Sequence, residues 1–420
     1  MDDQRLGSFI LVAVAFMATA AVSSGNIGEF DDHWQKRREA AEAWASESYV
    51  HDPFNVTNDF NHASGVLRRE LGGRKNKQYN GPCMATNPMD RCWRCRKDWA
   101  TDRKRMGRCA MGFGRRATGG LRGKIYVVTD PTDADAANPR YGTLRWGALQ
   151  TVPLWIIFAK SMVIRLSQEL LVASDKTIDG RGAQVHIASG GAGVTVQFAR
   201  NVIISNLHIH DVKHSDGGLV RDAPSHLGPR TRADGDGISL FGATDVWVDH
   251  GSTGVTVSNC HFTNHNDVML FGASDSYPQD QVMQITVAFN HFGRGLVQRM
   301  PRCRWGFFHV VNNDYTHWLM YAIGGGKSPT ILSQGNRYIA PPNIAAKVIT
   351  KYYAPESEWK NWAWHSEGDL FMNGAIFQAS QGAIARKLKK SDMVKPKPGS
   401  YVRRLTRFAG ALNCRPGQPC

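Results

Sequence analysis

A short motif, in which an asparagine precedes an aromatic residue by two positions, recurs at a fixed spacing in this chain. It reads Asn290-His-Phe292, Asn313-Asp-Tyr315 and Asn336-Arg-Tyr338, with a constant spacing of 23 between successive copies. Cys260-His-Phe262 and Leu207-His-Ile209 hold the same place in earlier segments, with extra residues between them. A period in the twenties is typical of a solenoid, in which each coil buries its inward face against the next. The motif therefore predicts stacked coils.

The asparagines of this motif have a structural interpretation. In stacked coils they lie one above another at a bend, where each side-chain amide can bond its neighbours and the backbone. We expect an internal ladder rather than catalytic groups. Leucine-rich repeats share the period but require a Leu-x-x-Leu-x-Leu consensus, which this sequence lacks.

Short strand-like runs separated by Gly, Asn and Asp begin at Lys124, without helical patterns between them. They are Ile125–Val128, Trp155–Phe158, Met162–Leu166, Lys176–Ile178, Val194–Phe198 and Val202–Ile204. Strands this short and numerous indicate an all-β architecture. Together with the repeat they predict a single-stranded, right-handed parallel β-helix.

The regions that flank this solenoid have a different character. An apolar run from Ser8 to Val22 ends in small residues, which indicates a cleaved secretory signal peptide, with an uncleaved anchor as the alternative. We expect a signal peptide over 1–24, a helical region and linker over 25–75, the catalytic β-helix over 76–385 and a basic tail over 386–420.

Secretion changes how the eight cysteines are interpreted. In an oxidising compartment an even count favours disulfides, and Cys414 with Cys420 is a candidate pair that pins the tail. Cys92-x-x-Cys95 could be half of a zinc site, but no second pair at metal spacing follows it. Asn55-Val-Thr57 is a glycosylation sequon, as expected for a secreted glycoprotein.

The charge balance indicates the kind of partner. Lys and Arg outnumber Asp and Glu by 51 to 36, which gives a formal charge of +15 and favours a polyanion. Secretion argues against nucleic acid, and no segment after the leader approaches membrane length. We expect a monomer in the cell wall that binds an acidic polysaccharide.

Four arginines gather within eleven residues, between the strand-like runs Val282–Phe289 and Phe307–Val311. They are Arg294, Arg299, Arg302 and Arg304. A solvated basic loop is one interpretation of such a cluster. The other is a site for carboxylates, because the planar guanidinium fork donates two parallel hydrogen bonds to them.

An acidic turn precedes the strand-like run Asp245–Asp249. In Asp234-Gly-Asp236-Gly237, carboxylates alternate with glycine, a pattern that can ligate Ca²⁺ through oxygen or simply form a turn. Arginines and a cation around a polyuronate would stabilise the negative charge that develops when the proton beside the sugar carboxylate leaves. Expulsion of the glycosidic oxygen then completes a β-elimination.

Three segments carry a family resemblance: Asp245–His250, Val268–Asp275 and, above all, Gly293–Gly306. With these motifs the chain resembles the plant pectate lyases from about Gly81 to its C-terminus. The resemblance implies a right-handed parallel β-helix that cleaves α-1,4-linked polygalacturonate with Ca²⁺, giving 4,5-unsaturated products.

The resemblance also implies roles for single residues. In the family's Arg-x-Pro-x-x-Arg pattern, Arg299 would be the catalytic base and Arg304 would bind the substrate carboxylate, with Arg302 and Arg294 as further substrate-binding residues. The Asp234 and Asp236 turn corresponds to the family's first calcium ligands. An arginine base is unusual, because the guanidinium normally stays protonated.

One stretch departs from the family pattern. After His250 about fifteen residues are missing, including the two aspartates that complete the calcium site in the family, and Val246 and Val255 are only nine residues apart. Nine residues cannot pass once round a coil, so one coil is absent or collapsed. Asp267 stands where some relatives have a lysine, and its charge would repel a uronate. Asp249 and Asp275 are weaker candidates as replacement ligands.

Three functions therefore remain open. The first is a pectate lyase, weakened by the loss after His250. The second is a pectin-binding wall protein that has lost catalysis, and the third is a hydrolase of the same polymer. A hydrolase needs an acid and a base on paired carboxylates, which the Asp234 and Asp236 turn could imitate.

Overall fold

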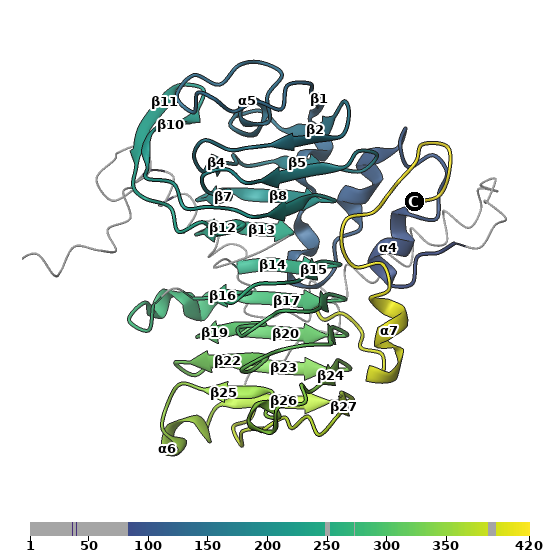
Figure 1. The fold of residues 1–420 in the computed structure, drawn as a ribbon, viewed down its shortest axis with the longest axis vertical. Helices are drawn as coiled ribbons and strands as arrows, with labels where there is room; N and C mark the ends of the chain where they lie inside the picture. Colours follow the sequence, from purple (N-terminus) through teal and green to yellow (C-terminus); the bar gives the residue numbers. More distant parts are fainter. Residues whose placement is uncertain (1–35, 37–38, 40–82, 248–252, 273, 385–391) are drawn as a thin grey trace, which may run out of the picture.

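The computed structural model describes residues 36, 39, 83–247, 253–272, 274–384 and 392–420, which form a solenoid of parallel strands (Figure 1). A continuous ten-stranded sheet, called here the long sheet, runs along its whole length. In order of pairing its strands are β1 (Lys124–Val128), β2 (Leu154–Phe158), β5 (Lys176–Asp179), β8 (Arg200–Ser205), β13 (Thr244–Trp247), β14 (Thr253–Ser258), β17 (Gln284–Ala288), β20 (Phe307–Val311), β23 (Thr330–Gln334) and β26 (Ala363–Glu367). The predicted parallel β-helix is confirmed.

Two further faces complete each coil, and both are interrupted. The second face has β3 (Met162–Ile164), β6 (Val185–Ala188) and β9 (His208–His210) in one sheet, and β15 (His261–Phe262), β18 (His291–Phe292), β21 (Asp314–Tyr315), β24 (Arg337–Ile339) and β27 (Leu370–Met372) in another. The third face has β4 (Leu170–Leu171), β7 (Val194–Gln197) and β12 (Ile238–Phe241), then β16 (Leu270–Phe271), β19 (Arg302–Arg304), β22 (Ile323–Gly326) and β25 (Thr350–Tyr352).

The two interruptions fall at the same level of the solenoid, between β13 and β14. These strands pair directly, with Val246 opposite Val255, nine residues further along the chain. By contrast, Ile285 pairs with Phe308, a full repeat further along the chain. A parallel pair ordinarily needs a crossover of a dozen or more residues, long enough to carry the other two faces. The direct pairing confirms the prediction that one coil is absent or collapsed: among the described residues, this coil supplies a strand to the long sheet only.

The predicted asparagine ladder lies inside the bend after the long sheet. Asn290 Nδ2 donates to Asn313 Oδ1, and Asn313 Nδ2 donates to Asn336 Oδ1, both over 3.0 Å. The three side chains are fully buried. The backbone N–H of Cys260 bonds Asn290 Oδ1 in the same way, and Asp369 accepts from Asn336 at the other end.

The aromatic residues of the repeat form a second ladder beside the first. The rings of Phe262, Phe292, Tyr315, Tyr338 and Phe371 stack in that order, with centroid distances of 5.3, 4.5, 4.6 and 5.9 Å. The three coils that hold Asn290, Asn313 and Asn336 therefore each contribute one buried amide and one ring at the same corner, which fixes the register of their neighbours.

Residues 83–122 cover the outer side of the long sheet with short helices. These are α4 (Pro88–Trp93), η2 (Arg103–Arg108), η3 (Gly112–Arg116) and η4 (Gly119–Arg122). The N–H of Gly114 donates to Thr256 Oγ1 over 2.9 Å, and the N–H of Phe113 donates to Thr286 Oγ1 over 3.1 Å. Gly119 has φ +54° and lies against Thr177, where a Cβ would come within 2.1 Å of the threonine hydroxyl. Only glycine fits this approach.

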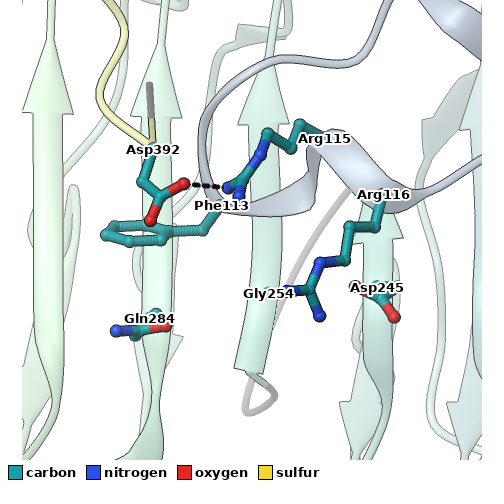
Figure 2. Close-up of a pocket in the computed structure, with 7 residues that line it drawn as sticks. All are labelled: Phe113, Arg115, Arg116, Asp245, Gly254, Gln284 and Asp392. Atoms are coloured by element: carbon teal, nitrogen blue, oxygen red, sulfur yellow. Dashed lines mark ion pairs between the residues drawn. The ribbon is translucent and has the colours of Figure 1, made fainter. Parts of the chain in front are cut away.

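The cover also lies over the collapsed coil. Figure 2 shows Arg115 and Arg116 of η3 above β13 and β14, with Arg115 ion-paired to Asp392 and Arg116 near Asp245. The cavity between them, about 20 Å³, has room for roughly one water molecule. The long-sheet side of the collapsed coil is therefore well packed. The missing residues interrupt only the other two faces.

Six cysteines form three disulfides: Cys83–Cys95, Cys92–Cys109 and Cys414–Cys420. The predicted terminal pair is confirmed, and the possible zinc pair is occupied by disulfides instead. Cys260 and Cys303 remain thiols, so the even cysteine count corresponds to three disulfides rather than four. They lie on different faces of the solenoid, Cys303 inside β19 and Cys260 just before β15.

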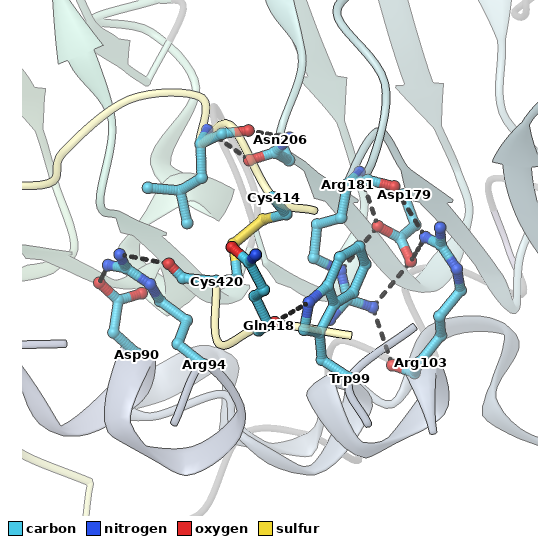
Figure 3. Close-up of a disulfide and its surroundings, with 11 residues drawn as sticks. Asp90, Arg94, Trp99, Arg103, Asp179, Arg181, Asn206, Cys414, Gln418 and Cys420 are labelled. Carbon is cyan, nitrogen blue, oxygen red and sulfur yellow. Dashed lines mark hydrogen bonds and ion pairs between the residues drawn. A yellow bond between two sulfur atoms is a disulfide. The ribbon is translucent and has the colours of Figure 1, made fainter. Parts of the chain in front are cut away.

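The C-terminal segment, with η7 (Gly399–Tyr401) and α7 (Val402–Leu405), packs against the cover (Figure 3). The N–H of Leu412 donates to Asn206 Oδ1 over 2.6 Å, and the carbonyls of Gln418 and Cys420 accept from Trp99 Nε1 and Arg94 Nη2 over 3.0 and 3.1 Å. The predicted signal peptide, the Asn55 sequon, most of the N-terminal helical region and residues 385–391 lie outside the described residues. Within the described part, no helix is long and apolar enough to cross a bilayer.

The remaining elements lie between coils. They are α5 (Leu144–Ala148), the antiparallel hairpin β10 (Gly218–Ala223) and β11 (His226–Arg230), η5 (Pro278–Val282), η6 (Ile344–Ala346) and α6 (Glu356–Trp359). The hairpin projects from the upper left of the solenoid in Figure 1 and leads directly into the acidic turn before β12.

Candidate active site

The arginine run lies on and before β19, on the third face. Side chains alternate along a strand, and Cys303, in the middle of β19, is fully buried. Arg302 and Arg304 are therefore directed away from the core, and both are partly exposed. Arg299 and Arg294 come from the loop that connects β18 to β19.

Arg299 adopts a left-handed backbone conformation, with φ +62°. This conformation is strained for a residue with a side chain, so the surroundings must hold it. They do so through the carbonyl of Arg299, which accepts a hydrogen bond from the N–H of Met269 over 2.7 Å. The Nε of Arg299 lies 3.0 Å from Asp267 Oδ1, an ion pair on a half-buried side chain.

Arg304 is held more tightly. Its Nε donates to Asp275 Oδ1 over 2.5 Å, and its Nη1 donates to the carbonyl of Gly272 over 2.6 Å. The Arg304 side chain is 13% exposed, whereas that of Asp275 is 54% exposed. The carboxylate of Asp275 thus occupies one edge of the guanidinium fork, and Nη2 remains for an external acceptor.

Arg302 reaches across a neighbouring strand. Its guanidinium lies 4.0 Å from the ring centroid of Tyr353, just beyond the end of β25, although β22 runs between β19 and β25. The reach is possible because Arg302 and Arg304 are in register with Gly324 and Gly326, which have no side chains in the way. Burial and the positive charge of Arg304 lower the pKa of Arg302, with a further contribution from Arg299.

These contacts bring three of the four predicted arginines together. Arg302 and Arg304 project from the same side of β19, and the loop that holds Arg299 runs directly into this strand. After burial, the positive charges of Arg304 and Arg299 are what lower the pKa of Arg302. Arg294 is exposed, and its only hydrogen bond within the described residues is through its carbonyl, which accepts from the N–H of Asn264 over 2.8 Å. No contact joins the Arg294 side chain to the other three arginines among the described residues, and its role in substrate binding stays a prediction.

Asp234 and Asp236 lie on the turn between β11 and β12, and both are exposed. The turn is fixed by the N–H of Ala233, which donates to the carbonyl of Ser215 over 3.0 Å. Asp236 Oδ2 also accepts from Ser239 Oγ over 3.3 Å. Carboxylates are suitable ligands for Ca²⁺, but the ion takes six to eight oxygens.

The described residues do not complete such a site. Among them, no group of three or more acidic, histidine or cysteine side chains is placed to hold a metal ion. The reason lies in the topology: β12, next to the acidic turn, and β16, next to β19, are edge strands of two separate sheets. The strand that would join them belongs to the collapsed coil. Asp275, a weaker candidate ligand, instead pairs with Arg304.

The sequence alone did not identify Tyr353 and Tyr321 as neighbours of the arginines. The hydroxyl of Tyr353 donates to that of Tyr321 over 3.1 Å, and burial together with this bond raises the pKa of Tyr321. The sequence does contain a signal for these neighbours, the triplet Gly324–Gly326 one coil after Arg302–Arg304. Because glycine has no side chain, it leaves room for the arginines to contact residues of the coil beyond.

Comparison with known proteins adds an independent line of observation. Residues 231–361 match the family model described as pectate lyase, and residues 26–73 match the model described as pectate lyase, N terminus. The chain is 57% identical to a pectate lyase of Lilium longiflorum, over 99% of this chain and 100% of that protein. It is 51% identical to a pectate lyase of Zinnia elegans, over 90% of this chain and 96% of that protein.

Solved structures agree with these sequence matches. The crystal structure of jun a 1, the major allergen from cedar pollen, is 42% identical, covers 78% of this chain and 99% of that one, and superposes with a TM-score of 0.75. The thermostable pectate lyase PL 47 is 18% identical with a TM-score of 0.56, a likeness of fold alone. The lily alignment extends over 434 residues, more than the 420 residues of this chain. That relative therefore has residues without counterparts here.

Proposed function

This chain belongs to the pectate lyase family, and from that membership we propose that it cleaves α-1,4-linked polygalacturonate by β-elimination. The observation that carries the proposal is the cluster of Arg299, Arg302 and Arg304 on the outer side of the third face. Concentrated guanidinium groups suit a polymer that carries one carboxylate per sugar.

Each arginine has a distinct part in this proposal. Arg304 binds the uronate carboxylate through Nη2, and Arg302 adds positive charge beside it. The neutral guanidine form of Arg299 takes the proton from C5 and becomes a guanidinium, the electron pair of that C–H bond forms the C4–C5 double bond, and the C4–O bond breaks. The departing glycosidic oxygen takes a proton from solvent. Positive charge at the carboxylate stabilises the carbanion character of the transition state.

The family resemblance implies calcium, which when bound would neutralise the uronate carboxylate and acidify the neighbouring proton. Asp234 and Asp236 would hold one side of such an ion. Since the described residues do not complete its coordination, we propose that the substrate's own oxygens supply much of it and that the affinity for the ion is low.

The experiment is an incubation of the secreted protein with polygalacturonate, with and without a chelator, while the ultraviolet absorbance of the unsaturated product is followed. We expect slow, chelator-sensitive formation of that product. Arg299→Lys should abolish it while the circular dichroism spectrum stays unchanged. Arg403→Lys, an exposed change on α7, is the matched control and should retain activity. Full activity in Arg299→Lys would refute its role as the base.

The incomplete cation site favours a second candidate function, because catalysis by β-elimination depends on the cation more than binding does. In that alternative the chain binds pectin in the wall without cleaving it. Retention of the protein on polygalacturonate without any product would support it. Reducing ends without ultraviolet absorbance would instead indicate a hydrolase, the third possibility.

We further propose that the protein is a secreted, monomeric glycoprotein of the cell wall, with a leader over 1–24, an N-terminal region over 25–75, the catalytic β-helix over 76–385 and a basic tail over 386–420. Six cysteines in disulfides agree with an oxidising compartment. N-terminal sequencing and deglycosylation of the protein recovered from plant apoplast would test these points. A start at Met1, or a mass unchanged by deglycosylation, would contradict the leader or the glycan.

A further inference from the structure

A concave site lies at the N-terminal end of the solenoid, away from the arginines of β19. It is a cleft of about 410 Å³, within the range of small-ligand sites. Three separate elements line it: the loop with Asn138 and Pro139, the end of α5 with Trp146, Leu149 and Gln150, and the hairpin with Arg221 and Pro224. Figure 1 places α5 and the hairpin at the top of the molecule, several coils away from β19.

Trp146, which lines this cleft, belongs to a cluster of three aromatic rings. Trp146 stacks on Tyr126 at a centroid distance of 5.3 Å and contacts the edge of Tyr141 at 4.7 Å. Tyr126 is fixed in turn, since its hydroxyl donates to the carbonyl of Thr143 and accepts from the N–H of Gly142. Tyr141 is 75% exposed, so an aromatic surface is presented to solvent. Rings held in place this way can pack against the apolar face of a sugar at low entropic cost.

Polar groups with unused hydrogen-bonding capacity lie around the same cleft. Arg221 uses Nε for the carbonyl of Ala137 over 2.7 Å and Nη1 for that of Pro224 over 3.3 Å, which leaves Nη2. Gln150 uses its amide nitrogen for the carbonyl of Trp146 over 2.7 Å, which leaves Oε1. The indole Nε1 of Trp146 has no partner among the described residues. Two donors and one acceptor are therefore free to bind a ligand.

A carboxylate lies nearby but is already satisfied. Asp135 accepts from the N–H groups of Ala137 and Asn138, both over 2.9 Å, and from Asn138 Nδ2 over 3.2 Å. These bonds close its own turn. Arg221 is thus the charged group that lines the cleft, and its positive charge and its remaining Nη2 favour an anion.

We propose that this cleft binds one carboxylate-bearing pyranose, a uronic acid unit of an acidic oligosaccharide. The sugar ring packs on Trp146, Arg221 Nη2 binds the carboxylate, and Gln150 Oε1 accepts from a hydroxyl. The choice of a uronate rests on the proposed function. Two sites on one elongated molecule would hold a long polymer more strongly than either site alone.

The test is isothermal titration calorimetry of the full chain with trigalacturonate. We expect two binding sites per chain. A variant of the arginine cluster, here called the groove variant, carries Arg302→Ala and Arg304→Ala. It should lose the site at the arginines and retain the site in the cleft. In that background, Arg221→Gln should weaken the remaining binding by about tenfold or more, as expected when a hydrogen bond to a charged group is lost. Tyr141→Ala should weaken it as well, and Tyr401→Ala, an exposed tyrosine on η7, is the matched control.

The possible outcomes distinguish binding in this cleft from binding at the arginine cluster of β19. Unchanged binding in both Arg221→Gln and Tyr141→Ala, or a single site in the unmodified chain, would overturn the second site. Equal affinity for neutral galactotriose would overturn carboxylate recognition by Arg221. Because the cleft is titrated in the groove variant, loss of lyase activity cannot be mistaken for loss of this site.

Discussion

Arg304 already holds a carboxylate of its own chain. Asp275 occupies its Nε edge, and Asp267 lies 3.0 Å from the Nε of Arg299. Both carboxylates are about half exposed, so solvent screens these pairs and their net strength is modest. They nevertheless compete with the anionic groups of a substrate for the same guanidinium groups.

Replacing Asp267 tests this competition. Asp267→Asn removes the negative charge beside Arg299, and we expect KM for polygalacturonate to fall by up to about fivefold, because an exposed ion pair contributes up to about 1 kcal/mol. The measurement is initial rate against substrate concentration at low and high salt, since salt should diminish the difference. Asp211→Asn, an exposed change beyond β9, is the control. A KM that does not fall would contradict the competition.

At this scale the sequence identified the residue types but not their partners. The pattern of Arg299 to Arg304 was visible, and so was the unusual acid at 267. The contact between Arg302 and Tyr353 was not, because it depends on the register of β19, β22 and β25. Segments of unequal length set that register: Ile323 pairs with Thr350, whereas Phe308 pairs with Ile331 across a shorter interval.

Among the elements, the bend after the long sheet is the best determined by sequence. The constant spacing predicted the ladder of Asn290, Asn313 and Asn336, and the structure adds the stack of aromatic residues beside it. A constant repeat places like residues at like positions, so periodicity alone suffices there. Periodicity does not predict contacts between different faces. The cysteine count, for example, did not show that Cys260 and Cys303 lie on different faces of the solenoid and stay unpaired.

Removing one amide of the ladder should destabilise the fold. Asn313 Nδ2 donates to the carbonyl of Val287 over 2.8 Å, and its Oδ1 accepts from the N–H of Asn290 over 3.0 Å. Asn313→Ala leaves both groups buried without partners, and we expect a loss of roughly 2–4 kcal/mol in the free energy of unfolding. Urea denaturation measures it, with the exposed Asn138→Ala as control. Equal midpoints for the two variants would show that the ladder contributes little.

A buried histidine on β20 should make stability depend on pH. Burial lowers the pKa of His309 to about 4, although its Nε2 bonds Gln334 Oε1 over 2.9 Å. The unfolded chain takes up this proton near pH 6.5, so stability falls as the pH drops from about 6.5 towards 4 and is fully retained above that range. The total loss is about 3 kcal/mol.

The variant His309→Gln isolates this contribution. Unfolding free energies at pH 7 and at pH 4.5 should differ less in the variant than in the unmodified chain. Because other groups titrate equally in both proteins, only the difference between the two pH dependences is informative. Parallel dependences would show that His309 is not buried in its neutral form.

Over the whole molecule, the collapsed coil separates two halves that are otherwise regular. The long sheet passes through the break, because β13 pairs with both β8 and β14. The other faces do not, and the acidic turn beside β12 is thereby separated from the arginines of β19. The nine-residue interval revealed this loss in the sequence, since a count of residues limits how far a chain can reach.

Lengthening the short coil should restore the missing strands. The variant carries a segment of the lily protein inserted between Trp247 and Thr253, long enough to give this coil the same repeat length as the coils that follow it. We expect a higher melting temperature, because two unpaired sheet edges on each interrupted face gain a partner. We also expect tighter calcium binding in calorimetry. An insertion that lowers the melting temperature and adds no calcium affinity would refute this account of the break.

The most direct test compares eliminative activity in the unmodified chain and in the lengthened one. Both are incubated with polygalacturonate and calcium, and the ultraviolet absorbance of the unsaturated product is followed. The account predicts slow formation of the product by the unmodified chain, a marked increase in the lengthened chain, and loss of both signals in Arg299→Lys. Reducing ends without absorbance, or no gain in rate from a correctly folded insertion, would contradict it.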